Sequence, residues 1–81
     1  MKIALVGSTG QMGQSVAAVA SDEGHEVVSR FHADRPFSEA SPSDLEDAEV
    51  AIDFSLPSLA LPHIRQYCAW GQPAVVGTTG W

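Results

Sequence analysis

The chain has 81 residues, the size of one small domain, and its 44% hydrophobic and 17% charged residues are typical of a folded globular protein. Ten acidic and four basic side chains give a net charge of -6, which disfavours nucleic acid and anionic membrane surfaces as partners. The single cysteine, Cys68, excludes an intrachain disulfide scaffold, and we expect a packed thiol in a reduced, cytoplasmic protein.

The first part of the chain predicts a strand, a helix and a second strand. The first strand covers Lys2–Val6, an apolar run that ends at a glycine. The helix covers residues 11–23, because apolar residues recur there at helical spacing and Gly24 follows as a terminator. β-branched residues then predict a second strand over residues 27–31.

Residues 34–49 are expected to be mostly a connection, because they hold six acidic residues and two prolines. Ser43 and Glu46 stand three residues apart, the spacing of a capping box. Such a box supports only a turn or two of helix, through residues 45–48. The sequence therefore predicts a shortened link where a full crossover helix often lies.

The last part of the chain predicts a buried strand over residues 50–54, a second long helix, and a final strand over Ala74–Val76. Pro62 complicates the start of that helix, because an internal proline removes a helical hydrogen bond. Two starts stay open: regular helix begins near Leu61, or the first turns are distorted over residues 57–60.

This alternation of strands and helices predicts a doubly wound α/β fold with a parallel sheet and helices on both faces. With so little helix between the second and third strands, the expected spatial order of the strands is 2-1-3-4. The order reverses between strands 1 and 3, where open α/β sheets bind ligands at their carboxyl ends. We expect the ligand site there.

A glycine-rich loop joins the first strand to the first helix, with Gly7, Gly10 and Gly13 at every third position. The first glycine would permit a tight turn, the second a close approach of backbone to a pyrophosphate, and the third close packing of helix on strand. Amides at the helix start would bind the phosphates. The loop predicts a dinucleotide site, and a purely structural turn or a site for another phosphate ligand is the alternative. The candidate residues are Gly7, Ser8, Thr9, Gly10, Gln11 and Met12.

Basic residues follow the second strand, where dinucleotide sites read the adenosine ribose. Arg30, His32 and Arg35 would suit the extra phosphate of NADPH, whereas Asp34 could meet the free ribose of NADH. The expected cofactor is therefore NADPH or NADH, with a slight preference for NADPH. A solvated loop without ligand contacts is the alternative.

Asp53 ends the third strand at the expected mouth of the site, and we expect its carboxylate to accept hydrogen bonds from loop amides. A phosphoacceptor role, as in a response-regulator receiver, would require an acidic pair where the glycine-rich loop stands. His25 and His63 have no partners at metal-ligand spacing and are expected at the surface, so no metal site is predicted.

Three segments together resemble one enzyme family: residues 3–13 (IALVGSTGQMG), 51–57 (AIDFSLP) and 75–81 (VVGTTGW). They are similar to the N-terminal domain of 4-hydroxy-tetrahydrodipicolinate reductase, also called dihydrodipicolinate reductase. The resemblance spans essentially the whole chain, and DFSxP combined with GTTGW is far more specific than the glycine loop. It implies a Rossmann-like NAD(P)H-binding domain of an oxidoreductase of lysine (diaminopimelate) biosynthesis, which transfers a hydride to its cyclic substrate.

The resemblance also implies roles for individual positions. The loop from Gly7 to Met12 would hold the pyrophosphate. Gly77, Thr78 and Thr79 would meet the nicotinamide and its ribose, and Phe54 with Ser55 would lie along the cofactor. The chain departs from the family at His32, where an acid is common, so the family's usual dual or NADH-leaning preference does not carry over.

In the family a C-terminal domain supplies the substrate pocket, a catalytic lysine in a His-rich motif and the tetramer interface, and these motifs do not occur in the 81 residues. We therefore expect residues 1–81 to be one dinucleotide-binding domain, without catalytic residues, that binds cofactor but does not turn over. An open edge on the last strand would allow a homo-oligomer. The alternative is a non-catalytic, Rossmann-like nucleotide-binding or structural module.

Overall fold

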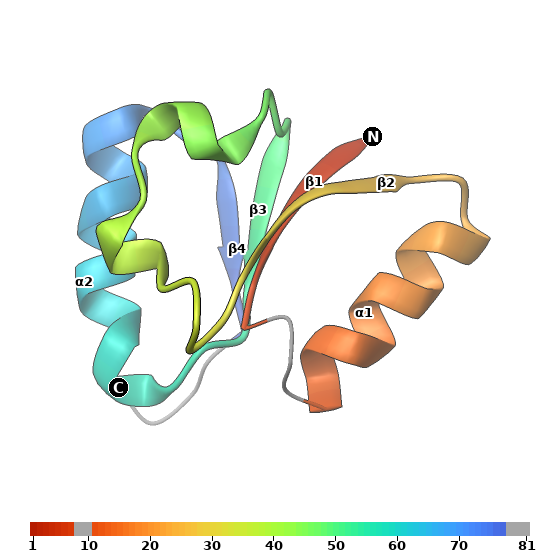
Figure 1. Ribbon diagram of the computed structural model, residues 1–81, viewed down its shortest axis with the longest axis horizontal. Helices are drawn as coiled ribbons and strands as arrows, with labels where there is room; N and C mark the ends of the chain where they lie inside the picture. The colour runs from red at the N-terminus through yellow and green to blue at the C-terminus, as the bar shows by residue number, and fades with distance from the viewer. Residues whose placement is uncertain (8–10, 78–81) are drawn as a thin grey trace.

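A computed structural model describes residues 1–7 and 11–77 and shows a parallel sheet between two layers of helix (Figure 1). The strands are β1 (Lys2–Val6), β2 (Glu26–Phe31), β3 (Val50–Asp53) and β4 (Ala74–Val76), and they lie in the order β2-β1-β3-β4. Helix α1 (Gln11–Asp22) covers one face and α2 (Pro57–Trp70) the other. The predicted doubly wound α/β fold and its strand order are confirmed. Among the described residues, no helix is long and apolar enough to cross a membrane.

Strand alternation gives the sheet face toward α2 a continuous core, because successive side chains of a strand point to opposite faces. The buried members of this core are Ala4, Val6, Phe31, Phe37, Leu45, Ala51 and Tyr67. The Phe37 ring lies at their centre, with ring centroids 5.2 Å from Phe31, 4.8 Å from Tyr67 and 5.4 Å from Trp70. Phe37 comes from the expected connection but is part of the core, where the residue is 2% exposed.

The connection between β2 and β3 contains two short 3-10 helices, η1 (Phe37–Glu39) and η2 (Pro42–Leu45), which lie on the same side as α2 (Figure 1). The capping box predicted at Ser43 and Glu46 is wrong. The amide of Ser41 instead donates to the Asp44 carboxylate at 2.8 Å, and Glu46 ends η2 in a left-handed conformation with φ of 52°. Pro42 explains the earlier start, since a proline at the first helical position loses no hydrogen bond.

Helix α2 begins at Pro57, so a regular start near Leu61 is also wrong. Pro57 occupies the first position of the helix, where its fixed φ favours helix and its missing amide costs nothing. Pro62 lies within the helix and leaves the carbonyl of Ser58 without its usual donor. Because Ser58 is exposed in the first turn, solvent can satisfy that carbonyl and the helix continues through the proline.

Candidate functional site

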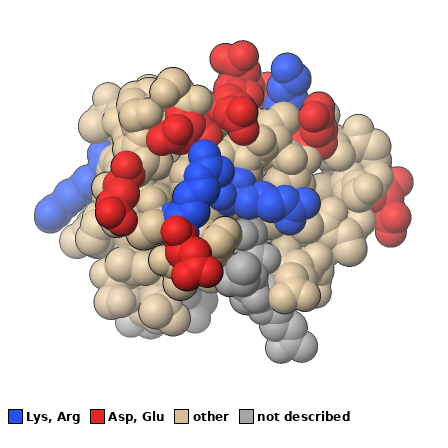
Figure 2. Space-filling model, in the orientation of Figure 1, with Lys and Arg blue, Asp and Glu red and all other residues tan. Residues whose placement is uncertain are grey.

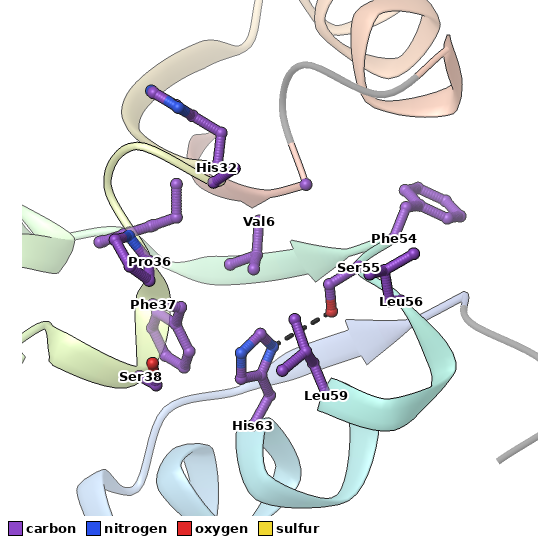
Figure 3. Close-up of a pocket in the computed structure, with 13 residues that line it drawn as sticks. Val6, His32, Pro36, Phe37, Ser38, Phe54, Ser55, Leu56, Leu59 and His63 are labelled. Carbon is purple, nitrogen blue, oxygen red and sulfur yellow. Dashed lines mark hydrogen bonds between the residues drawn. The ribbon is translucent and has the colours of Figure 1, made fainter.

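A cavity of about 320 Å³ opens on the α2 face at the carboxyl ends of β1, β2 and β3 (Figure 3). This is where the strand order reverses, and it is the expected place for a ligand in an open α/β sheet. Apolar side chains line most of the cavity: Val6, Phe31, Phe37, Leu56 and Leu59. Its polar lining comes from His32, Ser38, Ser55 and His63.

Gly7 turns the chain out of β1 at the rim of this cavity. Its φ is +84°, a conformation that favours glycine, and its amide donates to the carbonyl of Phe31 at 2.9 Å. A Cβ at this position would lie 2.9 Å from the carbonyl carbon of Phe54 and 3.1 Å from the amide nitrogen of Ser55. Only a glycine therefore allows the ends of β1 and β3 to approach this closely.

The ends of β3 and β4 meet in a similar way. The amide of Gly77 donates to the carbonyl of Asp53 at 2.8 Å, and a Cβ on Gly77 would lie 2.6 Å from Cδ1 of the Phe54 ring. The structure thus brings Gly7, Phe54, Ser55 and Gly77 to one edge of the sheet. Residues Ser8, Thr9, Gly10, Thr78 and Thr79 lie outside the described residues. Gln11 and Met12 open α1, and their side chains are also outside the description.

The basic residues at the end of β2 and just after it adjoin the cavity to different degrees. His32 lines it, and its backbone exchanges two hydrogen bonds with Arg35, at 3.1 and 3.0 Å. The Arg35 guanidinium lies 4.7 Å from the centroid of the Phe31 ring and donates to the carbonyl of Arg30 at 2.9 Å. The Arg30 side chain is exposed and does not line the cavity. Basic side chains lie together in the middle of the face shown in Figure 2, with carboxylates near them.

Asp53 is fully buried at the end of β3 and accepts four hydrogen bonds. Its Oδ1 accepts from the amide of Ser55 at 2.9 Å, as expected for a loop amide, and from the Ser55 hydroxyl at 2.5 Å. Its Oδ2 lies 2.9 Å from Nδ1 of His63 and accepts from the Tyr67 hydroxyl at 2.7 Å. Each carboxylate oxygen therefore has two hydrogen-bond partners, and a buried carboxylate requires such partners because it has lost its contact with water.

Two opposing effects act on the pKa of Asp53. Burial alone would raise it, but the hydrogen bonds from His63, Ser55 and Tyr67 outweigh burial and hold the pKa below its ordinary value of 3.8. Burial, together with the hydrogen bond to Asp53 and its charge, raises the pKa of Tyr67 far above its ordinary value of 10. Tyr67 is therefore a neutral donor to an ionised carboxylate.

His63 is not a surface residue, contrary to the sequence-based expectation, since only 3% of it is exposed. Helix α2 buries Ala60, His63 and Tyr67, whereas Cys68 is exposed and not packed as predicted. Two of the three buried residues, His63 and Tyr67, hydrogen-bond the buried Asp53. The expectation was correct for His25, which is exposed beside the chain's amino terminus. The spacing of positions 60, 63 and 67 is the signal that could have identified His63.

Comparison with known proteins identifies the family. Residues 1–81 match the family model described as dihydrodipicolinate reductase, N-terminus. The chain belongs to this family.

Two members that resemble the chain are both named 4-hydroxy-tetrahydrodipicolinate reductase. The protein from Staphylococcus aureus strain MRSA252 is 42% identical over 85 residues, which cover 99% of this chain and 34% of the relative. The protein from Natronomonas pharaonis is 37% identical over 87 residues, covering 99% of this chain and 35% of the relative. The chain spans about a third of the length of these curated relatives. It matches the part of this family that is described as the N-terminus.

Proposed function

We propose that this chain is the NAD(P)H-binding domain of a reductase that reduces 4-hydroxy-tetrahydrodipicolinate in lysine biosynthesis, and that by itself it binds cofactor without turnover. The observation that carries the proposal is the cavity at the β1–β3 reversal, which lies directly beside the Gly7 turn. Such a cavity, next to a loop that opens into a helix, is what a dinucleotide needs: a crevice for the adenosine and helix amides for the pyrophosphate.

The two ends of the cofactor would contact different strands. The adenosine would fill the apolar cavity between His32 and His63, and the pyrophosphate would cross the loop before α1 toward β3 and β4. Gly77 and Phe54 would then lie beside the nicotinamide. The two residues lie close together, because Gly77 has no Cβ and the Phe54 ring packs against its backbone. The bound cofactor supplies the hydride. Substrate binding and proton donation are assigned to the remainder of the reductase, since the described cavity carries no lysine and no arginine.

A slight preference for NADPH is also part of the proposal. Arg30 is exposed at the end of β2, and Arg35 is held beside it by the hydrogen bond to the Arg30 carbonyl. An extra phosphate on the adenosine ribose would add a charge-assisted hydrogen bond to such a site. Arg30 is the better residue to test, because Arg35 also contacts Phe31 and Asp44 and its removal would disturb the fold.

Calorimetric titration of the folded chain with NADPH and NADH tests the proposal. We expect both to bind, NADPH more tightly, and we expect Arg30→Ala to weaken NADPH about tenfold while NADH changes little. Arg65→Ala, which removes an exposed arginine from α2, is the matched control and should leave both affinities unchanged. Adding substrate should give no oxidation of the bound cofactor. No binding of either cofactor at millimolar concentration would contradict the proposal.

A further inference from the structure

The His63 imidazole points from α2 into the cavity and is held there on two sides (Figure 3). Its Nδ1 lies 2.9 Å from the Asp53 carboxylate and 3.2 Å from the Ser55 hydroxyl. The Phe37 ring packs against it edge to face, with a centroid distance of 5.1 Å and an interplanar angle of 81°. A polar ring that is 97% buried and fixed in this way has one orientation toward the cavity.

The contacts of Asp53 decide which nitrogen of His63 carries the proton. The Asp53 carboxylate accepts hydrogen bonds from Ser55 and Tyr67 on both oxygens, so no proton of its own is available to donate to His63. Nδ1 of His63 is therefore the donor of the 2.9 Å bond. In the neutral imidazole, Nε2 is then unprotonated and presents a lone pair.

Nε2 of His63 has no partner among the described residues, because each hydrogen bond of the imidazole within residues 1–7 and 11–77 is made by Nδ1. In the same residues, no buried side-chain nitrogen or oxygen is left without a partner. Nε2 must therefore reach the open volume of the cavity. The result is a single, ordered acceptor on a wall that is otherwise mostly apolar.

The chemistry of this wall selects a particular ligand group. Val6, Phe37 and Leu59 offer apolar contacts to a flat ring, and Nε2 of His63 requires a hydrogen-bond donor. Adenine has such a donor at its 6-amino group, whereas hypoxanthine and guanine carry a carbonyl oxygen at the same place. We propose that His63 recognises the adenine of the dinucleotide by accepting a hydrogen bond from its 6-amino group at Nε2. This inference rests on the proposed function and adds a specificity-determining residue to it.

Titration of the chain with NADH and with its hypoxanthine analogue, in which a carbonyl oxygen replaces the 6-amino group, tests the inference. We expect NADH to bind at least about tenfold more tightly, because the analogue would place an acceptor against an acceptor. In His63→Asn, the side-chain amide can still donate to Asp53, but the Nε2 acceptor is gone. The affinity ratio of the two ligands should then fall to about one. His25→Asn alters the exposed histidine and should keep the wild-type ratio.

The outcomes separate the two proposals. If the wild-type chain binds both ligands equally, or if His63→Asn keeps the discrimination, adenine recognition by His63 is overturned and cofactor binding stands. If the wild-type chain binds neither ligand, cofactor binding itself is overturned. Nitrogen-15 NMR of the wild-type imidazole gives a second test that needs no variant. The Nε2 resonance should move on addition of NADH and much less on addition of the analogue, and equal movement would contradict the inference.

Discussion

The two faces of the sheet are packed differently. The face toward α2 has the aromatic cluster around Phe37 and the hydrogen-bonded Asp53, both fully enclosed. On the face toward α1, Val19 is 60% exposed and Val75 58% exposed, and an apolar cleft of about 540 Å³ lies between the helix and the sheet. The candidate cavity opens on the α2 face, and Phe31 and Phe37 of the buried core form part of its lining. We expect the core on the α2 face to carry most of the stability of the chain.

The largest expected effect is the loss of an aromatic ring from the well-packed face. Phe37→Ala removes the ring that contacts Phe31, Tyr67 and Trp70, and we expect it to cost about 3 to 5 kcal/mol of unfolding free energy. Val19→Ala, on the other face, should cost less than about 0.5 kcal/mol, because that side chain is largely exposed. Urea unfolding followed by circular dichroism measures both.

If Phe37→Ala is too unstable to measure, Phe37→Leu provides a milder truncation at the same site. Equal costs for the Phe37 and Val19 variants would show that the two faces contribute equally, which would contradict the comparison.

A smaller effect is expected at the glycines with positive φ. Gly24, after α1, has a φ of +82° and open space around it, so Gly24→Ala should cost about 1 kcal/mol from backbone strain alone. Gly7 has nearly the same φ, but an added Cβ would meet the backbone of Phe54 and Ser55, and Gly7→Ala should cost about 3 kcal/mol. Urea unfolding of the two variants isolates the contact between the ends of β1 and β3. Costs that agree within experimental error would mean that this contact is easily relaxed.

At the buried carboxylate, we expect an effect below those at Phe37 and Gly7. Asp53→Asn leaves the four donors of Ser55, His63 and Tyr67 facing a neutral amide, and we expect a loss of about 2 kcal/mol at neutral pH. Because folding lowers the pKa of Asp53, its ionised form stabilises the fold above the ordinary pKa of 3.8, and this contribution is lost as pH falls through the folded-state pKa.

Unfolding curves at several pH values test this pH dependence. The stability difference between wild type and Asp53→Asn should stay constant above about pH 5 and shrink as the solution becomes more acidic than pH 3.8. Asp34→Asn, which replaces an exposed carboxylate, is the control. A difference that does not vary with pH would show that the charge of Asp53 does not contribute to stability.

Much of the fold could be predicted from local patterns. Apolar runs bounded by glycine predicted β1 and β4 correctly. Helical spacing of the apolar residues predicted the end of α1 to within one residue. The strand order followed from the short link between β2 and β3, because right-handed connections leave few alternatives. The glycine at position 7 could be assigned to a turn, since a backbone conformation with positive φ depends on one residue alone.

The sequence therefore determined the elements, the strand order and the edge of the sheet where the candidate site lies, because these depend on short-range periodicity and turn chemistry. Only the tertiary structure decided that Phe37 enters the core and that α2 turns His63 inward and Cys68 outward. The inward position of His63 goes with a carboxylate ten residues earlier, which is buried with donors from this neighbouring helix. Hydrogen-bond satisfaction of a buried charge is a property of the assembled layers, and no single segment carries it.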